Sequence, residues 1–169
     1  ATNYHVIDGC NKIIIDDLKA TVISKDIQND LALLKVNNKY KYVSTLSYKS
    51  PLLGDNISVF GYPLSDMFSD DHISLTKGSV SSLSGFEGNL SNFRFTAAVQ
   101  PGNSGGPVVN EEGRVVGITK SALGSKVLDK MKILPQNVNF GIRSNLLINM
   151  MESKLVVVIS DPLNKSDLI

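Results

Sequence analysis

The stretch from residue 100 to residue 107 reads Gln100-Pro101-Gly102-Asn103-Ser104-Gly105-Gly106-Pro107, with one serine among three glycines. Glycine adopts backbone angles that are closed to other residues, so the chain can turn sharply around Ser104. Such a turn can present the hydroxyl group while directing the N–H groups of Gly102 and Ser104 into one small space, as in an oxyanion hole. Taken alone, the motif is equally compatible with a glycine-rich surface loop between two strands.

Outward from this stretch, short apolar runs alternate with turn residues along most of the chain. Many runs carry β-branched residues, and Gly, Pro, Asn or Asp separates most of them, which indicates strands in an all-β barrel or sandwich. Residues 108–116 predict a hairpin whose Gly113 is free to adopt a positive φ. Helical spacing appears over residues 146–151, after Ser144 as a candidate N-cap, and the methionine pair there is expected to face the core. The expected strands are 12–15, 19–24, 31–36, 57–60, 73–84, 93–99, 107–110, 115–120 and 138–142.

The composition excludes several classes of protein. The chain has 169 residues, 42% of them apolar, and a formal net charge of +1, so one domain or two small packed lobes can bury a core. The basic residues form no stripe, which weighs against nucleic-acid binding, and no apolar run approaches the length of a membrane span. Cys10 is the only cysteine, so an intrachain disulfide is impossible. We expect it to be a turn residue rather than a nucleophile.

A serine hydroxyl is a weak nucleophile and needs a base, and the chain offers His5 and His72. His72 ends a polar stretch and is expected to be a solvated loop residue. His5 precedes an apolar pair and is expected at the mouth of a strand. Asp30 is the best candidate for the carboxylate that orients His5, because it stands immediately before the apolar strand 31–36, at the edge of the core, where a charge needs a partner.

Three blocks in this order resemble the signature blocks of trypsin-like serine proteases, and most closely those of the bacterial HtrA/Deg-type branch. The blocks are Thr2-Asn3-Tyr4-His5-Val6-Ile7, Asn29-Asp30-Leu31-Ala32-Leu33-Leu34 and Pro101-Gly102-Asn103-Ser104-Gly105-Gly106-Pro107. The order His, Asp, Ser is that of the chymotrypsin fold, and it differs from the orders in subtilisins and α/β-hydrolases.

The resemblance implies two antiparallel six-stranded β-barrels with the triad between them and a short C-terminal helix. It assigns residues 1–50 to the remainder of the first barrel, 51–154 to the second barrel with its helix, and 155–169 to an extension. The family places about three strands, roughly 30 residues, ahead of the histidine, and the first barrel is expected to lack them here. A fragment of a longer protein is the favoured explanation. The alternatives are strands from another chain, a gap filled by the apolar run 155–160, or a degenerate and inactive barrel.

The resemblance also implies a serine endopeptidase that acts through an acyl-enzyme on unfolded or extended polypeptide segments. Ser104 would be the nucleophile, His5 the general base and Asp30 its orienting group, with the N–H groups of Gly102 and Ser104 as oxyanion donors. No metal or other cofactor is implied. A non-catalytic peptide-binding module with a protease-like fold is the alternative, motivated by the absent strands. An esterase would share the chemistry, but the block order weighs against an α/β-hydrolase.

The expected substrate specificity and cellular location follow only from the resemblance. It implies that the substrate pocket lies between Ala98, Val99 and Gln100 on one side and Ser121 and Ala122 on the other. With no acidic residue at its base, a small or medium aliphatic P1 side chain is expected, while neighbouring Lys120 is expected to point outward. Asn103 stands where digestive members carry the aspartate that pairs with a newly cut N-terminus, so activation of that kind is not expected. The HtrA-like branch favours a bacterial periplasm or cell envelope and a regulatory domain elsewhere in the gene product.

Overall fold

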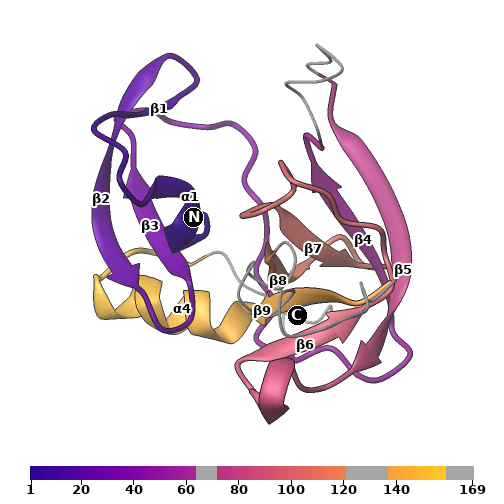
Figure 1. Cartoon of the computed structure of the whole chain (residues 1–169). Helices are drawn as coiled ribbons and strands as arrows, with labels where there is room; N and C mark the ends of the chain where they lie inside the picture. The colour runs from indigo at the N-terminus through magenta and orange to yellow at the C-terminus, as the bar shows by residue number, and fades with distance from the viewer. Residues whose placement is uncertain (64–71, 121–136, 159–169) are drawn as a thin grey trace, which may run out of the picture.

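Each predicted strand has a counterpart in the structure, and the largest difference is in the strand predicted over 93–99, which ends at Phe95. The structure is a computed structural model that describes residues 1–63, 72–120 and 137–158. Its elements in chain order are α1 (Tyr4–Ile7), β1 (Ile13–Ile15), β2 (Leu18–Asp26), β3 (Leu31–Lys35), β4 (Asn56–Gly61), β5 (Ser74–Ser82), the 3₁₀ helix η1 (Phe86–Gly88), β6 (Asn92–Phe95), β7 (Pro107–Asn110), β8 (Val115–Lys120), β9 (Asn139–Arg143) and α4 (Ser144–Ser153) (Figure 1).

Six strands close into an antiparallel barrel in the order β4-β5-β6-β9-β8-β7. The predicted hairpin joins β7 to β8, and its Gly113 has a φ of 77°. Phe93 is fully buried inside the barrel, and glycines on two strands make room for its ring. A Cβ atom would lie 2.7 Å from this ring at Gly117 and 2.5 Å from it at Gly141. The core also contains Ile57, Val59, Val80, Phe95, Ala97, Val108 and Val116.

Because the barrel closes around Phe93, removing this side chain should cost much of the stability of the domain. We expect Phe93→Ala to lower the free energy of unfolding by about 3–5 kcal/mol, since the two glycines cannot fill the cavity left behind. Phe86→Ala is the matched control, because Phe86 is 41% exposed, and it should cost less than about 1 kcal/mol. Urea denaturation of both variants measures the difference. Equal losses would mean that Phe93 is not the centre of the core.

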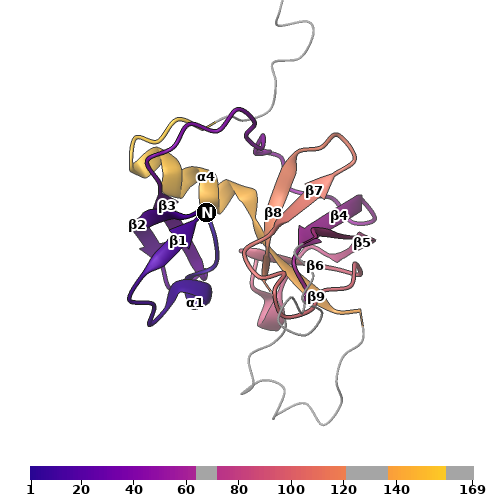
Figure 2. The same cartoon turned by 90° about the horizontal axis from the view of Figure 1, so that it is seen from above.

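The first barrel is only partly present, as expected. Strands β1, β2 and β3 form an antiparallel three-stranded sheet, and the other edge of β3 carries a single bridge from Thr2 to Ala32. Figure 2 shows this sheet and the closed barrel side by side, with α4 running along both. The predicted two-barrel architecture, with an incomplete first barrel and a C-terminal helix, is therefore confirmed.

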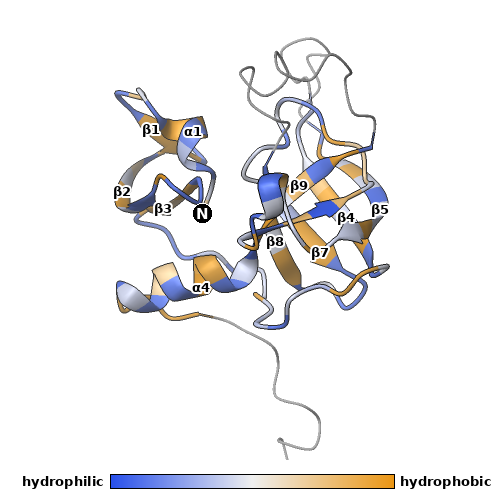
Figure 3. Cartoon of the chain, turned by 60° about the horizontal axis from the view of Figure 1, so that its bottom comes forward, coloured by the Kyte–Doolittle hydropathy of each residue, from blue (hydrophilic) through white to orange (hydrophobic). Residues whose placement is uncertain are grey.

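Helix α4 packs against β3 of the sheet and against β8 and β9 of the barrel. Met150 and Met151 pack partly buried against the core beneath the helix, as predicted. Figure 3 shows apolar stretches on α4 and on the barrel strands. The shared core between the two units consists of Leu31, Leu33, Leu46, Val115, Ile118, Ile142, Leu147 and Ile148. The helix thus stabilises the open side of the incomplete barrel.

Two local expectations were wrong. His5 lies in the short helix α1 rather than at the mouth of a strand. Ser144 is the first residue of α4 and not its N-cap, a position that Arg143 occupies. The hydroxyl of Ser144 instead donates a hydrogen bond to the carbonyl of Ser47, which satisfies a buried polar group where the chain enters the helix.

The apolar run at 155–160 contributes only in part to filling the gap. Val156 and Val158 pack against the shared core, while Leu155 and Val157 are 95% and 85% exposed. Residues 159 and 160 lie outside the described residues. In the part of the chain that the structure describes, no helix combines the length and the apolar character needed to cross a bilayer.

Candidate active site

His5 and Asp30 form a two-point contact. The carboxylate oxygen Oδ2 of Asp30 lies 2.8 Å from Nδ1 of His5, and Oδ1 accepts the backbone N–H of His5 at 2.9 Å. Asp30 is 6% exposed, whereas the side chain of His5 is 48% exposed. A buried carboxylate on Nδ1 fixes the tautomer and the ring orientation and leaves Nε2 to receive a proton.

The backbone around Asp30 explains this placement. Thr2 and Ala32 exchange two backbone hydrogen bonds, and the carbonyl of Asp30 accepts the N–H of Tyr4 at 3.2 Å. The side-chain amide of Asn3 donates to the same carbonyl at 3.1 Å. Asp30 has a φ of 59°, a left-handed conformation that aspartate tolerates better than most residues. The segment that leads into α1 therefore lies along β3, and His5 follows it directly onto Asp30.

Ser104 lies half-buried in a tight turn that is joined to β8 by backbone hydrogen bonds. Gly105 donates its N–H to the carbonyl of Thr119 at 2.9 Å, and Thr119 donates to the carbonyl of Gly106 at 2.8 Å. Gly102 and Gly105 have φ values of 100° and 82°, so both need the conformational freedom of glycine. At Gly102 a Cβ would lie 2.2 Å from the carbonyl oxygen of Tyr62.

The serine turn packs against the segment that precedes His5. A Cβ added at Gly105 would lie 2.3 Å from Oγ1 of Thr2 and 3.2 Å from the backbone nitrogen of Asn3. The structure thus brings the segments that carry His5, Asp30 and Ser104 together from the two packed units.

Lys120 makes a further contact between the two units. Its Nζ lies 3.5 Å from Oδ2 of Asp30, at the end of β8. The expectation that Lys120 points outward was therefore wrong. A buried carboxylate attracts a long cationic side chain that can reach it, and the alternation along β8 gave no sign of this contact.

The other residues singled out in the sequence differ in exposure, and two of them lie outside the described residues. Ala98 and Gln100 are exposed, and Val99 is half-buried against the barrel core. Ser121 and Ala122 lie outside the described residues. His72 is exposed two residues before β5, and Cys10 is an exposed free thiol. Within the described ranges, no group of three or more His, Cys, Asp or Glu residues is arranged to hold a metal ion.

Asn103 is buried beside Ser104, and its Oδ1 accepts no hydrogen bond from the described residues. A Cβ at Gly61 would lie 2.3 Å from this oxygen, so β4 approaches the turn closely. The asparagine therefore packs as part of the scaffold beneath the serine turn.

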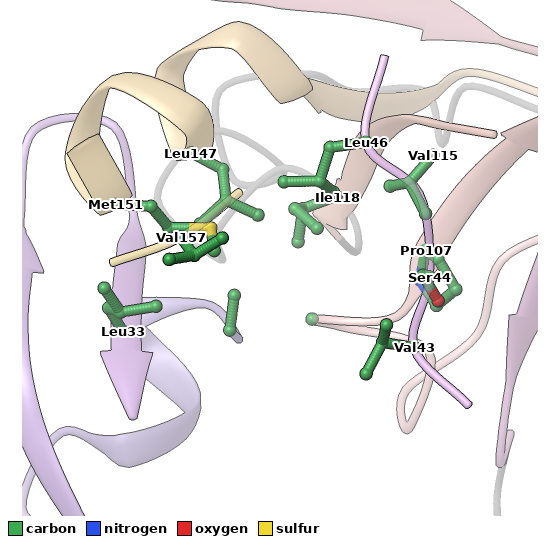
Figure 4. Close-up of a pocket in the computed structure, with 12 residues that line it drawn as sticks. Leu33, Val43, Ser44, Leu46, Pro107, Val115, Ile118, Leu147, Met151 and Val157 are labelled. Atoms are coloured by element: carbon green, nitrogen blue, oxygen red, sulfur yellow. The ribbon is translucent and has the colours of Figure 1, made fainter. Parts of the chain in front are cut away.

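A largely apolar cavity of about 370 Å³ lies behind the serine turn, between β3, α4 and the start of β7 (Figure 4). Neither His5, Asp30 nor Ser104 lines it, although Gly105 does. The other residues that line it are Ala1, Leu33, Val43, Ser44, Leu46, Pro107, Val115, Ile118, Leu147, Met151 and Val157. The cavity therefore belongs to the open core of the incomplete barrel and not to the group formed by His5 and Asp30.

Comparison with known proteins points to one family. The family model of the trypsin-like peptidase domain matches residues 1–118. Serine protease Do-like HtrA of Lactococcus lactis is 32% identical over 164 residues, which cover 88% of this chain and 39% of that protein. A probable periplasmic serine endoprotease, DegP-like, of Pseudomonas savastanoi is 38% identical over 126 residues, which cover 69% of this chain and 25% of that protein.

A solved structure, the serine endoprotease from Yersinia pestis, superposes with a TM-score of 0.70 at 26% identity, over 90% of this chain and 52% of that one. The chain therefore spans well under half the length of the two curated relatives. The matched residues include both the His5 and Asp30 segments and the turn around Ser104, and on this ground the chain belongs to the family of trypsin-like peptidase domains.

Proposed function

We propose that this chain is the catalytic part of a serine endopeptidase, with Ser104 as nucleophile, His5 as general base and Asp30 as the group that orients His5. The observation that carries the proposal is the contact of His5 Nδ1 with the buried carboxylate of Asp30, beside a serine turn that packs against the His5 segment. The names of the relatives, which are serine proteases, support the same chemistry.

In the proposed reaction, Oγ of Ser104 attacks a peptide carbonyl while Nε2 of His5 takes its proton. The N–H groups of Gly102 and Ser104 would donate to the oxyanion of the tetrahedral intermediate. The protonated His5 then gives its proton to the leaving amine, and an acyl-enzyme remains on Ser104. Water, deprotonated by His5, attacks the acyl-enzyme and releases the second peptide. Asp30 stabilises the imidazolium at both stages.

The proposed substrate is an extended polypeptide segment with a small or medium aliphatic P1 side chain. Ala98 and Gln100 are exposed in the segment that leads to the serine turn, where they can contact such a segment. We also propose the division at residues 50 and 154, because the strands before residue 50 form the three-stranded sheet and the strands after it form the closed barrel.

Covalent labelling tests the nucleophile. In the full gene product, a fluorophosphonate should form one bond to Oγ of Ser104 with release of fluoride, and peptide mapping should find the label there. Ser104→Ala should abolish labelling, and His5→Ala should slow it by about 10³-fold or more. Ser81→Ala, at an exposed serine on β5, is the matched control and should label like the parent protein.

The same samples separate the catalytic proposal from the alternative of a peptide-binding module. An endopeptidase should cleave an unfolded protein such as reduced casein, and Ser104→Ala should not. A folded parent protein that neither labels nor cleaves, yet binds peptides as tightly as its Ser104→Ala variant, would instead establish the binding module.

A further inference from the structure

Lys120 contacts the same carboxylate oxygen that holds His5. Oδ2 of Asp30 lies 2.8 Å from Nδ1 of His5 and 3.5 Å from Nζ of Lys120. Asp30 belongs to the partial first barrel, whereas Lys120 ends β8 of the closed barrel. The residue before it, Thr119, holds the serine turn through two backbone hydrogen bonds. A single stretch of β8 therefore contacts both the turn that carries Ser104 and the carboxylate that orients His5.

We propose that Lys120 is a positioning residue that acts through Asp30: it keeps the carboxylate ionised and in place beside a neutral His5, and thereby extends the enzyme's activity to lower pH. This inference rests on the proposed endopeptidase function. A histidine must be neutral to act as a base, and in that state it offers no charge to the buried Asp30. A buried charge without a partner is costly, and Lys120 is the permanent cation within ion-pair distance among the described residues.

The geometry allows both contacts together but sets them in competition. A carboxylate oxygen has two acceptor sites, so Oδ2 can receive the imidazole and the ammonium group at once. When His5 gains a proton, however, two cations share one oxygen. The imidazolium is then less stabilised than it would be beside Asp30 alone, and the neutral base is favoured. The lysine is 36% exposed, so solvent weakens this effect without removing it.

The neighbouring charged groups are engaged in other contacts. On α1, the hydroxyl of Tyr4 donates to Oδ1 of Asp8 at 2.7 Å, and this hydrogen bond raises the pKa of Tyr4, which stays neutral near pH 7. From β2, Nζ of Lys25 lies 5.6 Å from the centre of the Tyr4 ring. Asp26, at the end of β2, accepts two hydrogen bonds from Asn29.

The test is the pH profile of kcat/KM for a peptide substrate, measured on the full gene product. Lys120→Met removes the charge and keeps most of the length of the side chain. We expect the pH of half-maximal activity on the acid side to rise by about 0.5–1 unit in this variant. Lys120→Arg, which restores a cation, should bring the profile back to within about 0.2 unit of the parent's. Lys77→Met, at an exposed lysine of β5, is the control for charge alone and should leave the profile unchanged.

The outcomes are distinguishable from failure of the proposed function. If the parent protein labels with a fluorophosphonate and the Lys120→Met and parent profiles coincide, the inference about Lys120 is wrong while the endopeptidase stands. A shift in Lys120→Met that Lys120→Arg does not reverse would also overturn it, because it would reflect packing and not charge. Lys120→Gln provides the same test if the methionine variant folds poorly.

Discussion

Replacing Asp30 with asparagine should lower kcat about 10⁴-fold with little change in KM. The substitution keeps the shape of the side chain but replaces one carboxylate oxygen by an NH₂ group. If the amide nitrogen faces Nδ1 of His5, the ring must accept there and carry its proton on Nε2, where it can no longer take one from Ser104. The imidazolium also loses the negative charge that stabilises it, and Lys120 loses its partner. Steady-state hydrolysis of a peptide substrate measures the effect.

The control for this prediction is Asp26→Asn, four residues earlier on the same segment. Asp26 bonds to the backbone and the side chain of Asn29 and helps to shape the turn, so this variant should retain activity within about threefold. Both variants should be measured for unfolding by urea, so that loss of fold is separated from loss of chemistry. An Asp30→Asn enzyme that keeps more than a tenth of the parent's kcat would show that His5 is oriented by some other group.

Gly105→Ala should lower kcat/KM by about 10²-fold or more without preventing the barrel from folding. A methyl group at this position would meet Oγ1 of Thr2 at 2.3 Å, so the serine turn and the segment before His5 must move apart. A displacement of about 1 Å between a nucleophile and its base is enough for a loss of this size. The same peptide assay measures it, and fluorophosphonate labelling should slow in parallel.

Gly113→Ala is the matched control because it has the same backbone strain without the clash. Its φ of 77° is close to the 82° of Gly105, but no atom lies within 4 Å of its added Cβ. Both variants should lose about 1 kcal/mol of stability or more from the strained backbone, while only Gly105→Ala should lose activity. In Gly105→Ala, a second change of Thr2→Ala removes the closest atom and should restore part of the rate. A fully active Gly105→Ala enzyme would mean that the two segments can adjust freely.

Much of the fold was predictable because its information is local. The runs of β-branched residues, separated by turn residues, predict the ends of the barrel strands to within two residues, except that β6 stops at Phe95, four residues before its predicted end. Gly113 indicated a hairpin because the turn needs a positive φ at this position, and few residues other than glycine adopt one. The four-residue helix that contains His5 could not be predicted, since one turn has no periodicity and depends on bonds to Asp30. Ser144 resembled a cap because the sequence does not show that Ser47 would accept its hydroxyl.

The pairing of His5 with Asp30 was predictable from the sequence, but the full set of contacts at the candidate site was not. An acid directly before a buried strand indicates a partner for a histidine, and Asp30 lies against His5. Lys120 was missed because strand alternation describes which face of its own sheet a side chain occupies. It does not describe what a neighbouring unit brings to the end of that strand. Contacts between two packed units depend on how those units are arranged, and a pattern within one strand carries no record of that arrangement.

The division of the proposed catalytic groups between two units would separate activity from stability. The imidazole of His5, in α1, and the carboxylate of Asp30, directly before β3, belong to the unit built on the three-stranded sheet, while the hydroxyl of Ser104 belongs to the closed barrel, which has a hydrophobic core of its own. A rotation of one unit against the other by a few degrees would move the hydroxyl of Ser104 away from the imidazole of His5 and leave every strand paired. Calorimetry could then report an intact protein that hydrolyses nothing. A ligand that binds across both units could restore the rate with no gain of secondary structure.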